Sequence, residues 1–197
     1  NGNDNAYTIT VGTAEVEAAD LKSVNAATSV DVNADAVTKI TGDASDVLAV
    51  YAGGISGLGN EAVVLSSAAS VTEANAVDEK TSGVVTATIS DTAIDDLKGL
   101  NGNDNAYTIT VGTAEVEAAD LKSVNAATSV DVNADAVTKI TGDASDVLAV
   151  YAGGISGLGN EAVVLSSAAS VTEANAVDEK TSGVVTATIS DTAIDDL

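Results

Sequence analysis

The residues best suited to chemistry are the oxygen donors at the start of the chain, Asn1-Gly2-Asn3-Asp4-Asn5, which recur at 101–105. Amide and carboxylate oxygens beside a glycine turn are typical calcium ligands. The candidate ligands are Asn1, Asn3, Asp4, Asn101, Asn103 and Asp104. Asn and Asp also close turns by bonding their own backbone, and the single occurrence per hundred residues favours that second interpretation.

Catalytic chemistry has little support in the sequence. The chain contains no His and no Cys, which removes the usual nucleophile–base pairs and zinc sites. The acidic neighbours Asp95 and Asp96, like Glu15 and Glu17, do not point to one spot on a helix. The glycine-rich stretch 53–59 lacks the lysine of a phosphate-binding loop. We therefore expect a protein that is not an enzyme and that has no cofactor, and calcium at the Asn-rich loop is the one candidate.

Threonine pairs offer a third kind of site. Thr8 with Thr10 and Thr86 with Thr88 have the Thr-x-Thr form, and stacked strands would align them as in an ice-binding surface. Lys39 and Thr41 interrupt that pattern, and threonine is common on exposed strands. Ice binding is accordingly a weaker ligand hypothesis than calcium.

The charge balance limits the partners. Thirty acidic and seven basic residues give a net charge of −23, which opposes binding to nucleic acid or to an anionic membrane. No apolar run reaches the roughly 18 residues that a membrane span requires. We expect no nucleic-acid partner and no membrane insertion, and self-association through adjacent repeats and end-to-end assembly.

An internal repeat dominates the sequence. Residues 1–97 and 101–197 are identical, so we assign copy 1 to 1–100 and copy 2 to 101–197, continuous with copy 1. Copy 1 contains two diverged half-units, about 1–57 and 58–100. They share the order Gly-Asn-acid, strand, helix, Thr-Ser, strand, helix.

Alternation of β-branched with other residues predicts strands at Tyr7–Val11 and Val85–Ile89, and Ser29–Val32 and Ala62–Leu65 are further strand candidates. Between them, apolar residues recur at helical spacing. The expected helices are one through Ala14, Ala18, Leu21 and Val24 that is capped by Thr13 with Glu15 and Glu17 in its first turn, Ala44–Tyr51 capped by Asp43, Val71–Val77 capped by Ser70, and Thr92–Leu97 capped by Asp91.

These elements predict an α/β repeat solenoid. Each hundred residues contains four strand–helix segments of about 25 residues. A length of about 25 residues is typical of one turn of such a fold. The expected form is a β-solenoid with short helices on one side and leucine-rich-repeat-like stacking. The alternative is a string of immunoglobulin-like β-sandwiches, which have the same length of about 100 residues.

Stretches such as Tyr7–Val11, Ile40–Ala44 and Thr88–Ala93 resemble the tandem repeats of giant bacterial, cyanobacterial-type, cell-surface adhesin-like or haemolysin-like proteins. The resemblance covers the whole chain in style and composition, and it implies an extracellular or cell-surface location. The expected function is a non-catalytic structural module of a long fibre, filament or adhesin stalk that stacks end to end. The alternative is a calcium-dependent adhesion repeat.

Overall fold

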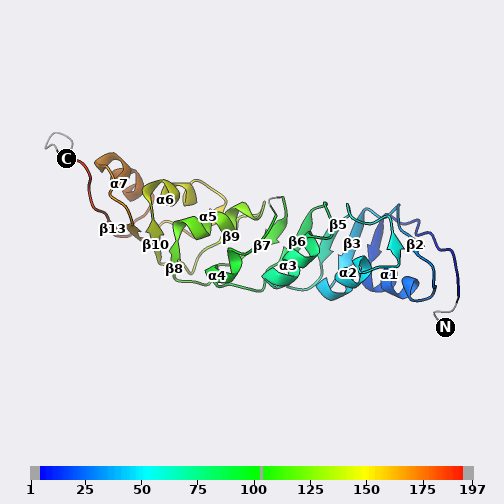
Figure 1. Cartoon of the computed structure of the whole chain (residues 1–197). Coiled ribbons are helices and arrows are strands. Elements are labelled where there is room, and N and C mark those ends of the chain that lie inside the picture. The colour runs from blue at the N-terminus through cyan, green and yellow to red at the C-terminus, as the bar shows by residue number, and fades with distance from the viewer. Residues whose placement is uncertain (1–4, 103, 193–197) are drawn as a thin grey trace. The chain divides into compact units, whose positions relative to one another are not determined.

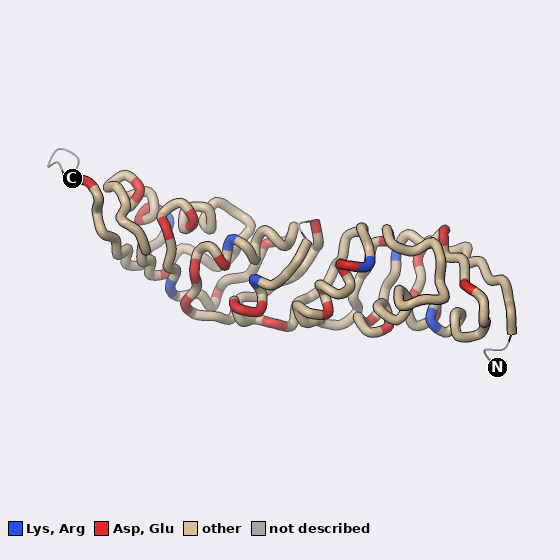
Figure 2. Tube along the Cα trace, in the orientation of Figure 1, with Lys and Arg blue, Asp and Glu red and all other residues tan. Residues whose placement is uncertain are grey.

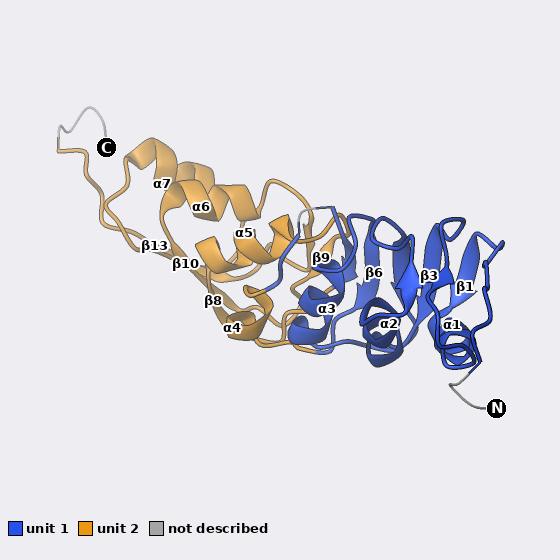
Figure 3. Cartoon of the chain, turned by 45° about the vertical axis from the view of Figure 1, so that its right-hand side comes forward, with its two compact units in different colours: residues 1–90, 100–108 blue, residues 91–99, 109–197 orange. Residues whose placement is uncertain are grey.

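A computed structural model describes residues 5–102 and 104–192. In these residues short strands and helices alternate along the chain (Figure 1). They divide into two compact units (Figure 3). Unit 1 comprises Asn1–Ser90 and Leu100–Thr108, and unit 2 comprises Asp91–Gly99 and Ile109–Leu197. The compact units therefore do not coincide with the sequence copies, because each unit includes a segment of the other copy.

Unit 1 consists of strand–helix segments that follow one another along the chain. Its elements are β1 (Glu15–Glu17), α1 (Ala18–Asn25), β2 (Val32–Asn33), β3 (Lys39–Gly42), α2 (Ala44–Tyr51), β4 (Ile55–Ser56), β5 (Ala62–Leu65), α3 (Val71–Asp78), β6 (Val85–Thr88) and β7 (Ala106–Thr108).

Unit 2 repeats this order. Its elements are α4 (Ile94–Leu97), β8 (Glu115–Glu117), α5 (Ala118–Ala126), β9 (Val132–Asn133), β10 (Lys139–Gly142), α6 (Ala144–Val150), β11 (Ile155–Ser156), β12 (Ala162–Leu165), α7 (Val171–Asp178) and β13 (Val185–Thr186).

The strands of unit 1 form a five-stranded parallel sheet in the order β1-β3-β5-β6-β7, with β2 and β4 paired in a small second sheet. The register places Val16 opposite Ile40, Ile40 opposite Val63, and Val63 opposite Val85. All strand pairs among the described residues are parallel. Immunoglobulin-like sandwiches are antiparallel, so the architecture is an alternating α/β repeat and differs from the alternative that the sequence left open.

The core of unit 1 is a column of aliphatic side chains under the sheet. Ile40, Val63 and Val85 are fully buried in consecutive strands. Helices α1, α2 and α3 lie side by side against the strands and add Leu21 and Val47 to this layer (Figure 1). Each such side chain contributes about 1.5–3 kcal/mol by leaving water, and none of the short helices would be stable without that packing.

Unit 2 has the same construction, with a sheet ordered β13-β12-β10-β8 and a second pair β11–β9. Helices α4, α5, α6 and α7 follow each other as packed neighbours. The register repeats that of unit 1, since Ile140 lies opposite Val116 and Val163. The strand pairs that both units share therefore have the same register.

The predicted helices at Ala44–Tyr51 and from Val71 are confirmed as α2 and α3. Ser70 caps α3 as expected, and Glu73 completes a capping box by accepting from the Ser70 backbone N–H at 2.9 Å. These bonds hold the pKa of Glu73 below its usual value. Asp43 precedes α2 but makes no side-chain cap bond, because its carboxylate accepts from the hydroxyls of Ser66 and Ser67, both at 2.8 Å.

Two predicted helix starts are wrong. The helix after Thr13 begins only at Ala18, because Glu15–Glu17 forms strand β1 instead of a first helical turn. The cause is cross-strand pairing, which places Glu15 opposite Lys39 with an ion pair of 3.4 Å. The helix predicted to start at Thr92 also begins later, at Ile94, whose N–H donates to Thr113 Oγ1 at 2.9 Å.

The strand predictions hold best in the sheet interior. The strand at Ala62–Leu65 is confirmed as β5, and Val85–Thr88 is confirmed as β6. The strand expected at Ser29–Val32 is shifted to Val32–Asn33. Tyr7–Val11 contributes only an isolated bridge from Thr10, whereas the same sequence in copy 2 forms β7.

Candidate functional site

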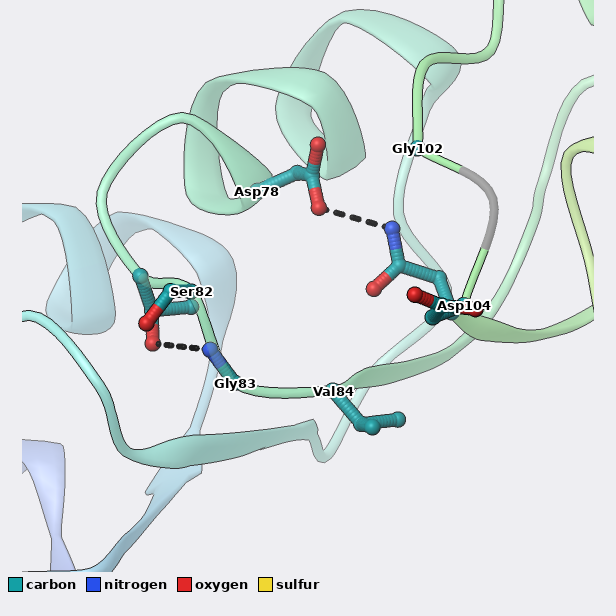
Figure 4. A pocket seen from close by; sticks show the side chains of 8 residues that line it. Asp78, Ser82, Gly83, Val84, Gly102 and Asp104 are labelled. Carbon is teal, nitrogen blue, oxygen red and sulfur yellow. Dashed lines mark hydrogen bonds between the residues drawn. The ribbon is translucent and has the colours of Figure 1, made fainter.

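The predicted calcium loop of copy 2 lies at a pocket in unit 1. The pocket has a volume of about 380 Å³ and is lined by the end of α3, the turn that leads into β6 and the segment that leads into β7 (Figure 4). Its acidic residues are Asp78 and Asp104. The Asp78 carboxylate points to the amide nitrogen of Asn105, which donates to Asp78 Oδ1 at 2.7 Å.

The turn on one side of the pocket is held by Thr81. Its hydroxyl donates to the Glu61 carbonyl at 2.6 Å and accepts from the Gly83 N–H at 3.0 Å. Gly83 is required there, because a Cβ would lie 2.3 Å from the Glu61 carbonyl oxygen. The backbone of this turn therefore lies directly on the preceding strand–helix segment.

Asn105 forms the other side. It is 3 % exposed, and its Oδ1 accepts from the Val85 N–H at 2.8 Å while its Nδ2 bonds Asp78. In this way a side-chain amide extends the hydrogen-bond ladder of β6 just before β7 begins. Gly102 supports the arrangement, since its φ of +83° suits glycine and a Cβ would lie 2.3 Å from the Asn105 amide nitrogen.

Two of the six predicted calcium ligands lie in the part of the chain that the structure describes. Asn101 donates its backbone N–H to Asn75 Oδ1 at 2.8 Å, and Asp104 is exposed at the pocket rim. The other four, Asn1, Asn3, Asp4 and Asn103, lie outside the described residues. Among residues 5–102 and 104–192, no three His, Cys, Asp or Glu side chains gather as a metal-binding group. Calcium binding stays a prediction.

Sequence reasoning missed a buried carboxylate, Glu61, which is fully buried in unit 1. Its carboxylate accepts from the Tyr51 hydroxyl at 2.8 Å, from the Gly59 N–H at 2.8 Å and from the Asn60 N–H at 3.2 Å. The hydrogen bonds from these three donors compensate for the cost of removing the carboxylate charge from water. Glu161 has the same partners in unit 2.

Glu61 and its partners close the turn that leads into β5. All contacts of the Glu61 carboxylate are with the donors that fix the turn before β5. Burial, followed by the contact with Glu61, raises the pKa of Tyr51 well above its ordinary value. The one sequence signal for this network is an acid placed directly before an aliphatic strand, and nothing in that signal identifies Tyr51 as its partner.

Polar bonds repeatedly join one strand–helix segment to the next at a separation of 20 to 25 residues. The ion pairs of this kind are Lys22–Asp46, Lys39–Glu15, Lys98–Asp120, Lys122–Asp146 and Lys139–Glu115. The side chains of these pairs are partly to largely exposed, so screening by solvent keeps the contribution of each pair to stability small. Acidic residues outnumber lysines along both units (Figure 2).

No family model, curated protein or solved structure matches this chain. The function must therefore be inferred from the geometry of the chain's own residues. Among the described residues, no helix is both long and apolar enough to cross a bilayer.

The threonine pairs are only partly aligned in unit 1. Thr88 lies opposite Thr108, but Thr86 lies opposite Ala106 and Val64. Along these strands one threonine therefore lies opposite another only at Thr88 and Thr108, and ice binding stays a prediction.

Proposed function

We propose that this chain is a non-catalytic structural module of a long extracellular fibre, filament or adhesin stalk. In this proposal the strand–helix segments of successive copies stack as one continuous solenoid. The observation that carries it is the repeated pairing of each segment with the next, in the same parallel register in both units. A protein built in this way is extended by adding copies and needs no linker.

The aliphatic column supplies the cohesion of such a fibre. Val63 is fully buried and lies between Ile40 and Val85 in neighbouring strands, so each strand–helix segment covers the apolar surface of the one before it. The hydrogen bonds between neighbouring parallel strands pair the backbone N–H and C=O groups along the same direction, from one segment to the next. Apolar burial and hydrogen bonding thus both hold consecutive segments together. In the proposed stalk, tension acts along this same direction, from one segment to the next.

Equivalent side-chain ties in the two half-units support the proposal. Each tie runs from a Thr-Ser pair to backbone carbonyls of the preceding segment. The four bonds are Thr28 Oγ1 to Tyr7 O at 2.7 Å, Ser29 Oγ to Asn5 O at 3.1 Å, Thr81 Oγ1 to Glu61 O at 2.6 Å and Ser82 Oγ to Gly59 O at 3.3 Å. The older internal repeat therefore preserves contacts between segments.

The proposed extracellular location rests on composition and on the resemblance to cell-surface repeat proteins. Thirty acids against seven lysines give neighbouring fibres a strong mutual repulsion, which salt or divalent cations would reduce. The chain also lacks Cys and Met, the side chains that oxidants attack first.

A calcium-dependent adhesion repeat is the second candidate. The observation in its favour is that Asp78 and Asp104 line one pocket beside the loop that the sequence analysis selected. Calcium there would tie the end of α3 to the start of β7. This candidate predicts a loss of rigidity when a chelator is added.

Electron microscopy of proteins with two, four and eight copies tests the proposal. Parallel strands are spaced about 4.8 Å apart, so four strand–helix segments add about 20 Å per copy on the strand side. We expect uniform rods whose length rises in proportion to copy number. Flexible chains with one bead per hundred residues would contradict the continuous solenoid. A chelator that converts rods into flexible chains would favour the calcium candidate.

A further inference from the structure

Asn101 is followed by glycine and lies in an exposed segment of the chain. Among the described residues it is the one asparagine that precedes a glycine, since every other one precedes alanine or glutamate. Asn101 and Gly102 belong to no helix or strand, and Asn101 is exposed. Gly102 has no side chain that could shield its backbone nitrogen. This nitrogen can therefore approach the side-chain carbon of Asn101.

The backbone on both sides of this dipeptide is anchored to unit 1. The Asn101 N–H donates to Asn75 Oδ1 at 2.8 Å, which ties the segment to helix α3. Further along the chain, the Asn105 side chain accepts from the Val85 N–H and donates to the Asp78 carboxylate. The dipeptide thus lies in a short connection whose two ends are fixed.

Gly102 is closely packed within this connection. A Cβ added to it would lie 2.3 Å from the amide nitrogen of Asn105 and 3.2 Å and 3.3 Å from the two carboxylate oxygens of Asp78 (Figure 4). The backbone at Gly102 therefore cannot move toward these side chains without displacing them.

We infer that Asn101 is a site of spontaneous deamidation, and that the modification loosens the bonds by which Asn105 joins copy 2 to copy 1. Asparagine is among the thermolabile residues of proteins. The reaction needs only the chain itself and water as the co-reactant. The inference goes beyond the proposed structural function, because it makes the connection between copies depend on the age of the protein.

The chemistry has two steps. The Gly102 backbone nitrogen loses its proton to a base in the solvent and attacks Asn101 Cγ. The new carbon–nitrogen bond replaces the bond from Cγ to the side-chain nitrogen, which leaves as ammonia after taking up a proton from the solvent. Water then opens the cyclic imide. Attack on the side-chain carbonyl gives aspartate, and attack on the backbone carbonyl gives isoaspartate, in which the main chain runs through Cβ and Cγ.

Isoaspartate lengthens the main chain by one methylene between residue 101 and Gly102. Because Asn75 and Asn105 hold the connection on either side, the extra length displaces Gly102 and with it the side chains packed on it. The product also carries a carboxylate where the parent has a neutral amide. This charge adds to the repulsion near Asp78 and Asp104, which line the neighbouring pocket.

Peptide mapping of the 197-residue chain during storage in a mildly alkaline buffer tests the site. Trypsin cuts after Lys98 and Lys122, so residues 99–122 are released as one peptide that contains Asn101 and differs from every peptide of copy 1. Mass spectrometry detects the loss of ammonia and gain of water, and electron-transfer fragmentation separates isoaspartate from aspartate.

The exposed Asn60, which precedes a glutamate, is the matched control for this measurement. We expect conversion at Asn101 to be at least about tenfold faster than at Asn60. Equal rates at the two positions would overturn the assignment of the site.

Urea denaturation of fresh and stored protein tests the consequence. The stored parent should unfold at a lower urea concentration than the fresh parent, shifted toward the midpoint of Asn105→Ala. Asn101→Ser cannot form the imide and keeps the backbone N–H that bonds Asn75, so its midpoint should match that of the fresh parent and stay constant on storage. Changes elsewhere in the chain are common to both proteins.

Asn101→Asp separates the two effects of the modification. It reproduces the charge of the products without the added methylene, so its midpoint should lie between those of the fresh and stored parent. Complete conversion at Asn101 with an unchanged midpoint would overturn the inferred loosening, as would an equal loss of stability in stored Asn101→Ser.

Discussion

Glu61 and Asn105 occupy matching places in the two half-units, and their side chains bond in different directions. Each is buried and immediately precedes an alanine that opens a strand of the five-stranded sheet. Glu61 closes its own turn through the N–H groups of Gly59 and Asn60. Asn105 instead reaches back to the N–H of Val85 in the preceding strand.

The difference separates two tasks that a repeat protein must combine. A carboxylate with local donors fixes the shape of one segment, whereas an amide, which both donates and accepts, connects two segments. Asn105 belongs to copy 2, and its partners Val85 and Asp78 belong to copy 1. The amide is therefore the tie between consecutive copies, and the carboxylate is a tie within one.

The largest effect should come from Glu61→Ala. It leaves the Tyr51 hydroxyl and the N–H groups of Gly59 and Asn60 without their acceptor inside unit 1. The free energy of unfolding should fall by about 3 kcal/mol. Urea denaturation followed by circular dichroism measures it, and Glu161→Ala should cost the same because its contacts in unit 2 are the same. A loss under about 1 kcal/mol would show that water replaces the carboxylate.

Asn105→Ala should have the next largest effect. It removes the acceptor of the buried Val85 N–H and the donor to Asp78, with an expected loss of about 2 kcal/mol. Asn105→Asp is the matched variant, since it keeps the acceptor but places a second carboxylate beside Asp78. If Asn105→Asp unfolds at the same urea concentration as the parent, the contact with Asp78 does not contribute.

Tyr51→Phe tests the Glu61 network by pH. The pKa of Tyr51 is raised in the folded protein, so its neutral form stabilises the fold below pH 10 and this stability is lost as pH rises above that value. Phenylalanine cannot ionise, so the urea midpoint of the variant should fall less steeply between pH 9 and 11. At neutral pH the lost hydroxyl bond should cost about 1 kcal/mol. Identical slopes for parent and variant would contradict the coupling.

The fold was more predictable than the contacts that join its segments. The short aliphatic run Ala62–Leu65 and the capping residue Ser70 identify β5 and α3, because both signals are local in sequence. The local sequence predicts a helix at Glu15–Glu17, because the strand conformation of these residues depends on pairing with Lys39, and Glu15 and Lys39 are 24 residues apart. Local periodicity contains no information on such a partner.

The candidate sites show the same limit. The residue types of the Asn-rich loop suggest calcium. The side chain that connects the two copies, however, is that of Asn105, which is not among the predicted ligands. Its role follows from burial in a ladder, and the sequence alone does not place Val85 beside it. Tyr7 and Tyr107 are identical in sequence context, so only the structure distinguishes an exposed from a buried ring.

The smallest effect is expected for Asn5→Ala, the same substitution as Asn105→Ala at the equivalent position of copy 1. The Asn5 carbonyl, which receives the Ser29 N–H, is retained by alanine, and residues 6–8 pair with no strand within the described part of the chain. The loss of stability at position 5 should therefore be smaller than the loss of about 2 kcal/mol at position 105, as measured by urea denaturation. Equal losses of monomer stability at positions 5 and 105 would mean that the amide acts within its own segment, and the distinction between the two kinds of tie would be wrong.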